Sequence, residues 1–303
     1  MNKFRTAHEG LDSMALAPDG QTLTVGHNQE LCLYQLPAGE RVRTIPLKGS
    51  AAVWGLAFSP DGKELAGCDA GSVWVWTLAT GRGRQLPFTP RYATANVDVR
   101  YSPNGKTLVC VGPVLARWRV RGKKELPAWD LGADLMTRAV AFSPDGATLA
   151  ICTAAQAQKG TAFRAAVRLL DSESGQSKGE LQWRGYPAES LSFSADGRRI
   201  AGTGGPYLRV WDLDAGKELA QLEPPDKQRG TARMENARFS PDGKWLAATY
   251  DLSVHVWHAE TLRVAHSYCW DVGSIQRFEF SPDGLTGIAA SRDGEVVVWD
   301  VEG

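Results

Sequence analysis

Histidine is the side chain that most often performs acid–base or metal chemistry near neutral pH, and this chain of 303 residues contains five of them. His255 and His258 are the closest pair. They lie in or just after an apolar, β-branched segment that is expected to be extended, where residues three apart point to opposite faces and make a poor metal pair. His8, His27 and His266 have no histidine neighbour at ligand spacing. We therefore expect no metal site.

Sequence motifs of the common enzyme classes are also absent. The chain has no Gly-x-Ser-x-Gly elbow, no phosphate-binding Walker loop and no His-Glu-x-x-His. Its many aspartates fall in turn sequences, where a short carboxylate accepts hydrogen bonds from the following backbone. We therefore predict that the chain is not an enzyme, with no catalytic residues and no cofactor.

The cysteines also give no indication of a catalytic or metal site. There are five, an odd number, widely spaced and without a Cys-x-x-Cys pair, at positions 32, 68, 110, 152 and 269. That pattern does not indicate a disulfide framework or a zinc site. Buried reduced thiols acting as small hydrophobes are expected instead, and the expected location is cytoplasmic.

Composition narrows the class of partner. The chain has 34 basic and 34 acidic residues, a net charge of zero, and 43% hydrophobic residues. Proteins that act mainly on nucleic acid or anionic membranes have a basic excess, so neither partner is favoured. No stretch of about 18 apolar residues occurs, and no apolar run follows residues 1–6, so we expect neither a membrane span nor a signal peptide.

A seven-fold repeat organises the whole chain. Its motif is a four-residue turn, Ser-Pro-Asp-Gly in most copies, and the intervals between successive turn glycines are 42, 43, 41, 51, 46 and 41 residues. The copies end at Gly20, Gly62, Gly105, Gly146, Gly197, Gly243 and Gly284. Proline presets φ at the second position, Asp or Asn suits the third, and glycine accepts the positive φ that completes the turn.

Each turn lies between short apolar runs typical of strands. The run before the turn ends in an aromatic residue in six copies, and a third run is dense in β-branched and aromatic residues, as in Val73–Trp76 and Val296–Trp299. A further turn and a fourth run follow. Four short strands in about 42 residues are typical of a β-propeller blade. The sequence thus predicts an all-β fold, a seven-bladed β-propeller of four-stranded antiparallel blades, as a single domain over residues 1–303.

At this point the chain resembles the WD40 repeat family over essentially its full length. A tryptophan ends the third strand in five units, and the Trp-Asp pair itself survives as Trp211-Asp212 and Trp299-Asp300. Ala7-His8-Glu9-Gly10 is similar to the family's Gly-His segment. No unit collects the complete buried His, Ser or Thr, Asp and Trp network known in the family, so blade stability is expected to depend mainly on apolar packing.

The ends of the chain predict how the propeller closes. The seventh unit stops three residues after Asp300, without a fourth strand of its own. Residues 3–6 precede His8 as a fourth strand would. We therefore predict that the N-terminal strand joins the last blade and removes two open sheet edges.

The resemblance also implies where a partner would bind. In the family, the residue four before each strand-ending aromatic points to the rim of one loop-rich face, and the loops between the second and third strands reach the same face. The first set is Asp12, Trp54, Val97, Arg138, Glu189, Glu235 and Gln276. The second set is His27, Asp69, Tyr250 and Arg292. Trp and Arg are favoured interface anchors, although any one of these residues could be an ordinary solvated side chain.

Longer connections add basic residues to this face. The fourth unit carries an excess of about ten residues near positions 153–164, with Lys159 and Arg164, which should extend the hairpin between its second and third strands. A second long connection, residues 223–233, ends at Arg233, and a third covers residues 87–92. Each could equally be a tolerated surface insertion.

These observations predict that the chain is a non-catalytic interaction scaffold that binds a protein or peptide partner on the loop-rich face. We expect the chain to be a monomer. The expected contacts are Asp12, Trp54, Arg138, Lys159, Arg164, Glu189, Arg233, Glu235, Gln276 and Arg292. The alternative is a small-ligand or enzymatic propeller that uses the channel mouth, for instance through a carboxylate pair formed by Glu189 and Glu235. Nucleic-acid binding would require Arg138, Lys159, Arg164 and Arg233 to cluster.

Overall fold

The structure is a computed structural model of the chain, and it describes residues 1–27, 29–47, 52–69, 71–87, 98–112, 115–127, 129, 131, 135–155, 164–225 and 233–302. The chain forms two compact units. The first comprises residues 1–128 and 279–303, and the second comprises residues 129–278.

Antiparallel sheets of four strands account for nearly all of the first unit, and three of them follow the chain order. The first contains β2 (Ser13–Leu16), β3 (Thr22–His27), β4 (Glu30–Gln35) and β5 (Glu40–Pro46). The second contains β6 (Gly55–Phe58), β7 (Glu64–Cys68), β8 (Val73–Thr77) and β9 (Arg82–Gln85). The third contains β10 (Asp98–Tyr101), β11 (Thr107–Val111), β12 (Ala116–Arg119) and β13 (Lys124–Glu125), with the short 3-10 helix η1 (Arg121–Lys123) before β13.

The second unit repeats this arrangement with longer strands. Its first sheet contains β14 (Leu135–Phe142), β15 (Thr148–Ala155), β16 (Arg164–Asp171) and β17 (Ser177–Arg184). The next contains β18 (Ser190–Phe193), β19 (Arg199–Gly204), β20 (Tyr207–Asp212) and β21 (Lys217–Leu222). The third contains β22 (Met234–Phe239), β23 (Trp245–Tyr250), β24 (Ser253–His258) and β25 (Val264–Cys269).

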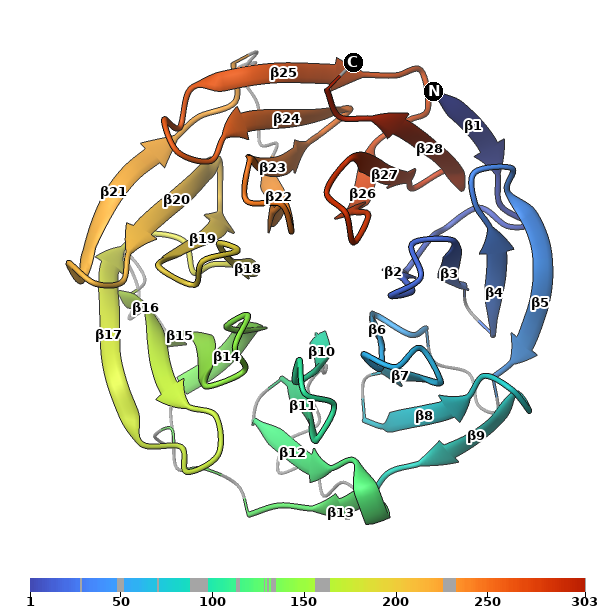
Figure 1. Ribbon diagram of the computed structural model, residues 1–303, viewed down its shortest axis with the longest axis horizontal. Helices are drawn as coiled ribbons and strands as arrows, with labels where there is room; N and C mark the ends of the chain where they lie inside the picture. The colour runs from blue at the N-terminus through green and yellow to red at the C-terminus, as the bar shows by residue number, and fades with distance from the viewer. Residues whose placement is uncertain are drawn as a thin grey trace. The chain divides into compact units, whose positions relative to one another are not determined.

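The N-terminal strand completes the last sheet, as predicted. This sheet has the order β1-β28-β27-β26, from β1 (Asn2–Arg5), β28 (Glu295–Asp300), β27 (Thr286–Ser291) and β26 (Ile275–Phe280). Asn2 is paired with Val298 and Arg5 with Glu295, and Figure 1 shows β1 beside β28 near the two labelled chain ends. With seven four-stranded antiparallel blades, the predicted fold class, a seven-bladed β-propeller closed by its N-terminal strand, is confirmed.

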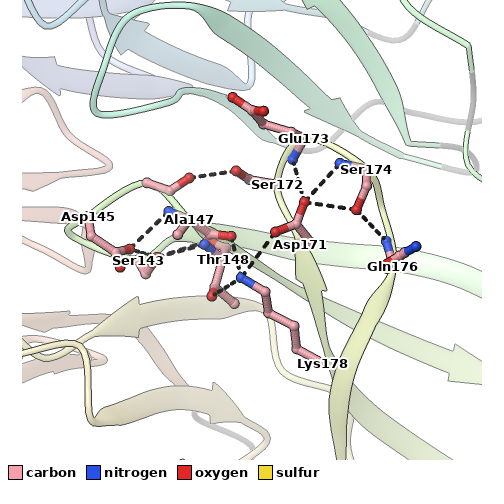
Figure 2. A network of polar contacts seen from close by, with 11 residues as sticks. Ser143, Asp145, Ala147, Thr148, Asp171, Ser172, Glu173, Ser174, Gln176 and Lys178 are labelled. Carbon is pink, nitrogen blue, oxygen red and sulfur yellow. Dashed lines mark hydrogen bonds and ion pairs between the residues drawn. The ribbon is translucent and has the colours of Figure 1, made fainter.

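The repeated turn is held by a fixed set of hydrogen bonds, which Figure 2 shows for the fourth blade. The Ser143 hydroxyl donates to Asp145 and accepts from the Thr148 amide at 2.9 Å, while the other carboxylate bond comes from the Ala147 amide. The same serine-to-aspartate bond occurs in the turns at Ser59, Ser194, Ser240 and Ser281. The motif therefore repeats because its serine and aspartate satisfy the turn's own backbone amides.

The turns also pack against one another from blade to blade. A Cβ on Gly62 would lie 3.9 Å from Cδ of Pro18, and one on Gly105 would lie 3.7 Å from Cδ of Pro60. In the second unit Gly197 has the same relation to Pro144, at 3.6 Å. The motif proline thus does two things: it sets its own turn and covers the glycine of the following turn.

Apolar residues fill the space between the sheets. The five strand-ending tryptophans are buried, and Tyr34 and Leu170 are buried at the same position in the other two blades. Within the second unit, Trp211 packs with Cys152, Leu191 and Phe193 in one cluster. Four of the five cysteines are buried free thiols and Cys269 is exposed. No helix in the described ranges has the length and apolar character needed to cross a membrane.

Two blades depart from the regular pattern. In the fourth blade β15 and β16 pair over eight residues, from Thr148–Asp171 to Ala155–Arg164, so residues 153–155 and 164 belong to this hairpin. The rest of the expected insertion, residues 156–163, lies outside the described residues. In the third blade the outermost strand β13 follows η1 and has only two residues, which pair with Trp118 and Arg119 of β12. The outermost strand of this blade is therefore shorter than those of the other blades and pairs only with the end of β12.

Candidate functional site

The second unit gathers charged side chains where the chain enters successive blades. Arg138 lies at an irregularity in the pairing of β14 with β15, between Thr137 and Ala139. Glu235 precedes a similar irregularity in β22, where Asn236 adopts a positive φ of 52°. The Asn236 side-chain amide is held by the Thr249 hydroxyl and the Gln276 carbonyl. Such bulges re-aim side chains without ending the strand.

Arg233 connects two blades in this region. Its Nη1 lies 3.1 Å from Oε1 of Glu189, and both side chains are partly exposed. The Arg233 guanidinium also lies over the ring of Tyr186, with Cζ 5.8 Å from the ring centroid. We call Tyr186, Glu189, Arg233 and Glu235 the mixed-charge cluster. It combines an aromatic ring, an arginine and two carboxylates.

Tyr186 is held in place although half of its surface is exposed. Its ring lies against Gly205, where an added Cβ would overlap the ring. Its backbone carbonyl accepts a hydrogen bond from Nε1 of Trp183 at 3.0 Å, and Trp183 itself packs on Trp211. A large aromatic side chain that is exposed yet fixed from below loses little entropy when a partner covers it.

Glu235 is the more protected of the two carboxylates. Burial raises the pKa of Glu235, and the negative charge of Glu189 raises it further. Arg277 and Arg233 act in the opposite direction on the same pKa. Glu189 and Glu235 are therefore close enough to influence each other, as the sequence hypothesis of a carboxylate pair required.

Arg138 and Gln276 flank the mixed-charge cluster. Both Arg138 and Glu189 act electrostatically on the buried thiol of Cys152, whose pKa burial raises to about 12. The Ala188 amide, one residue before Glu189, donates to that sulfur at 3.1 Å. Gln276 bonds through its side-chain amide to Ser274 and through its carbonyl to Asn236. Four predicted contacts, Arg138, Glu189, Arg233 and Glu235, are thus brought into one electrostatic neighbourhood.

The predicted contacts of the first unit are placed separately. Trp54 is half-buried, and its amide donates to the Cys68 carbonyl at 2.9 Å. The Asp12 side chain is half-buried, while its amide donates to the Gly26 carbonyl. Arg292 is exposed, and its carbonyl accepts from the Gly10 amide.

Two residues of the second-to-third-strand set are in fact covered: His27 and Tyr250 are buried. Their expected place on an open rim is therefore wrong. His27 packs edge-on against His8, with the ring centroids 5.2 Å apart, and Tyr250 belongs to an apolar cluster with Trp257. Asp69 accepts hydrogen bonds from the amides of Gly71 and Ser72 within its own turn.

The nucleic-acid hypothesis required four basic residues to cluster. Arg233 is paired with Glu189, and Arg164 lies on the β15–β16 hairpin opposite Arg184 of β17. Lys159 and Val97 lie outside the described residues, as do residues 88–92 and 226–232. Among the residues that the structure describes, no group of three or more His, Cys, Asp or Glu side chains could hold a metal ion.

Two residues of this site were missed by the sequence reasoning. Tyr186 lies in the short segment between β17 and β18, three residues before Glu189, the position that the repeat singles out. Arg277 follows Gln276 and acts on Glu235. The Gly-Tyr-Pro sequence at 185–187 was a usable signal, because an aromatic beside glycine and proline in a loop is a frequent interface anchor.

Comparison with known proteins supports the assignment of the repeats. The family described as "WD domain, G-beta repeat" matches residues 39–77, 233–258 and 260–300. The small ribosomal subunit protein RACK1y of Oryza sativa subsp. japonica is 31% identical over 128 residues, which cover 39% of this chain and 36% of that protein. Protein HIR1 of Candida albicans is 22% identical over 173 residues, which cover 40% of this chain and 19% of that protein.

The matched regions therefore span about a third or less of these relatives. The family matches cover the three inner strands of the second, sixth and seventh blades, and the first match also includes the outer strand β5 of the first blade. The repeats, the buried strand-ending tryptophans and the seven blades agree with one another. The chain thus carries WD40 repeats in the matched segments and folds as a seven-bladed β-propeller.

Proposed function

We propose that this protein is a non-catalytic scaffold that binds a protein or peptide partner through the mixed-charge cluster. The observation that carries the proposal is Tyr186, a half-exposed aromatic ring fixed between Gly205 and the Arg233 guanidinium. Tyr and Arg are enriched among residues that dominate binding energy, particularly where neighbouring groups hold them in place.

The charges around Tyr186 define the kind of partner. Arg233 pairs with Glu189, and Arg277 and Arg233 both act electrostatically on Glu235. Arg138 acts on the same buried thiol as Glu189, so the region carries charges of both signs. Such a surface favours a polar segment with charges of both signs and one apolar group to cover Tyr186. Gln276, Arg164 and Lys159 are proposed as further contacts from the second half of the chain. Trp54, Asp12 and Arg292 are proposed as further contacts of the first unit.

We further propose a cytoplasmic location and a role within a larger assembly. Free cysteines, four of them buried, fit a reducing compartment such as the cytoplasm. The similarity to a protein that is named as part of the small ribosomal subunit supports a role within an assembly. The chain is proposed to enter that assembly as a monomer.

Affinity capture with matched charge variants tests the proposal. The first variant is Tyr186→Ala/Arg233→Glu, and its control is Leu219→Ala/Arg198→Glu. The control removes an exposed apolar side chain on β21 and reverses an arginine that is paired with Asp214 at 2.8 Å in the same unit. Each double variant changes the net charge equally. Partners recovered with wild type should be lost with the first variant and kept with the control; equal recovery with both would contradict the site.

A second candidate function is binding or turnover of a small ligand at Glu189 and Glu235. It is favoured by the raised pKa of Glu235 beside a second carboxylate, an arrangement suited to acid–base chemistry. Mass spectrometry of small molecules that co-purify with wild type and with Glu235→Gln separates the two functions. A ligand that is lost in the variant, with protein capture unchanged, would favour this second function.

A further inference from the structure

A cavity of about 1030 Å³ opens in the first unit at the turn-bearing ends of the second and third blades. Its walls come from the β6–β7 turn, the β10–β11 turn and the ends of β8 and β12. This region has no part in the mixed-charge cluster, whose residues belong to the second unit. The volume is just above the usual range for ligand pockets, about 300 to 1,000 Å³.

The lining of this cavity is basic. Lys63, Lys106, Arg119 and Arg121 all line it and all are exposed. Within the described part of the chain, the charged groups of Lys106, Arg119 and Arg121 have no ion-pair partner. Arg121 reaches this position because η1 replaces the start of a regular outer strand, with Gly122 at a φ of 80°. Three cations are therefore available to a ligand.

The acidic residues of the lining are already engaged. Asp61 accepts bonds from the Ser59 hydroxyl and the Lys63 amide, which lower the pKa of Asp61. Glu64 interacts with the phenol of Tyr101. Burial is the main cause of the raised pKa of Tyr101, and the negative charge of Glu64 raises it further. Both carboxylates lie on the second-blade side of the cavity.

The third-blade side carries a neutral residue where the repeat has an acid. Of the seven turns, six have aspartate at the third position and this one has Asn104. The Oδ1 of Asn104 accepts from Ser102 and from the Lys106 amide, as the aspartates do in their turns. The amide nitrogen remains as a hydrogen-bond donor at the cavity. Aspartate at this position would have placed a negative charge beside Lys106. Because Asn104 is neutral, the cavity favours binding of an anion.

The surrounding sequence strengthens the local positive potential. Residues 70–124 contain ten Lys or Arg and one acidic residue, Asp98, although the whole chain is neutral. An electrostatic excess of this kind attracts anions before contact and raises their association rate.

The form of the cavity distinguishes among anions. Single-stranded nucleic acids bind along basic grooves with aromatic side chains on which bases stack. The described lining residues include no aromatic side chain, and the carboxylates of Asp61 and Glu64 border one side. A continuous polyanion would meet those carboxylates, whereas a single dianionic group would face only the cations. Arginine forks and lysines are the usual partners of a phosphate monoester.

We propose that this cavity binds a phosphorylated serine or threonine on a partner protein. Arg119 and Arg121 pair with the phosphate, Lys106 and Lys63 supply further positive charge, and the Asn104 amide donates a hydrogen bond. The scaffold would then hold two segments, one at each unit, and the second one only after phosphorylation. This inference goes beyond the mixed-charge cluster and does not depend on it.

Fluorescence anisotropy provides the test, at low salt with the full chain. The probes are a pool of fluorescein-labelled heptapeptides with phosphoserine at the centre and degenerate flanks, and the same pool with serine. The test variant is Arg119→Glu/Arg121→Glu. The control is Arg82→Glu/Arg84→Glu, which reverses two exposed arginines of β9 that do not line the cavity. Both variants change the net charge by the same amount, and circular dichroism checks that both are folded.

The phosphoserine pool should bind wild type at least tenfold more tightly than the serine pool. The Arg119/Arg121 variant should weaken phosphopeptide binding at least tenfold, and the control should stay within twofold. Asn104→Asp restores the residue of the other six turns, so it should fold normally and still weaken binding at least threefold. Equal binding of the two pools, no binding of either pool, or equal losses in test and control variants would overturn the proposal. Tighter binding of a twelve-residue oligouridine than of the phosphoserine pool would overturn it in favour of nucleic acid.

Discussion

The ring of Tyr186 lies directly against Gly205, so that no side chain can be added to Gly205 without overlapping that ring. This contact sets the position of the aromatic residue at the centre of the mixed-charge cluster. It also links a backbone feature, the positive φ of Gly205 at 63°, to the proposed binding surface.

Gly205→Ala should therefore disturb both stability and binding. The left-handed backbone costs an alanine about 1–2 kcal/mol, and the new methyl group also displaces Tyr186. Gly216→Ala is the matched control, because Gly216 has a φ of 62° and open space around its Cβ position. Urea unfolding should show the larger loss for Gly205→Ala, and partner capture should fall only in that variant. Equal unfolding losses with partner capture intact in both would contradict this role of Gly205.

Closure by β1 should contribute strongly to stability. The Phe4 ring lies against Gly39 and 5.6 Å from the Tyr34 ring, and the Tyr34 hydroxyl accepts a bond from the Ala7 amide. Removing residues 1–7 should lower Tm by on the order of 10 °C, because two sheet edges reopen and several kcal/mol of packing is lost. Thermal unfolding followed by circular dichroism measures this, and an unchanged Tm would exclude a stabilising closure.

A point substitution separates side-chain packing from the strand itself. Phe4→Ala should destabilise by about 1–3 kcal/mol, less than a fully buried phenylalanine because the ring is only partly covered. Lys3→Ala on the same strand removes a partly exposed contact with Glu295 at 3.5 Å. Such pairs contribute at most about 1 kcal/mol, so the control should unfold close to wild type.

Protonation of His27 should make stability depend on pH. Burial lowers the pKa of His27 most, the nearby His8 lowers it further, and the Gly10 backbone and Glu30 oppose the change. A lowered folded-state pKa means that the unfolded chain takes up a proton that the folded chain resists. Stability from this group is then complete above the unfolded pKa of about 6.5 and is lost as the pH falls below it, by at most about 1.4 kcal/mol per pH unit.

The measurement is the urea unfolding free energy of wild type and His27→Leu at pH 7.5 and pH 5.5. His8 remains in both proteins, with its 2.6 Å contact to Glu30. The loss between the two pH values should be smaller in His27→Leu. Identical losses would show that His27 is not a source of the acid sensitivity.

The turn glycines should differ in their tolerance of a methyl group. Gly20 and Gly62 have nearly the same φ, 68° and 67°, but a Cβ on Gly20 would lie 3.0 Å from Cδ of Pro282, against 3.9 Å from Pro18 for Gly62. Both alanine variants pay the strain of the left-handed backbone. Gly20→Ala should lose at least about 1 kcal/mol more, since overpacking adds roughly 1–3 kcal/mol. Equal unfolding free energies would mean that the Pro282 contact adjusts freely.

The sequence was sufficient for the fold because each blade repeats the same local chemistry. Proline, aspartate and glycine fix every turn, and the register then carries Trp211 or Trp257 to the same buried position. The closure by β1 followed from the missing fourth strand at the other end of the chain. These features depend on residues close in sequence or on the repeat period.

The candidate site was only partly predictable. Arg138, Glu189 and Glu235 were found because the repeat period points to them. Tyr186 was missed because its place depends on a contact with Gly205 across a loop, which no period encodes. His27 was placed on an open rim although His8 and the closing N-terminal segment cover it. The basic cavity depends on η1, a local departure from the repeat.

The most direct test of the proposed scaffold is site-specific photocrosslinking at Tyr186. The photoreactive amino acid p-benzoylphenylalanine replaces Tyr186 in one protein and Leu219, an exposed residue of β21 in the same blade, in the other. After irradiation in native lysate, the protein labelled at 186 should form a discrete adduct with the partner recovered by affinity capture, and the protein labelled at 219 should not. Binding at the mixed-charge cluster would be contradicted by adducts of equal yield at positions 186 and 219. It would also be contradicted if the protein labelled at 186 formed no adduct with the captured partner.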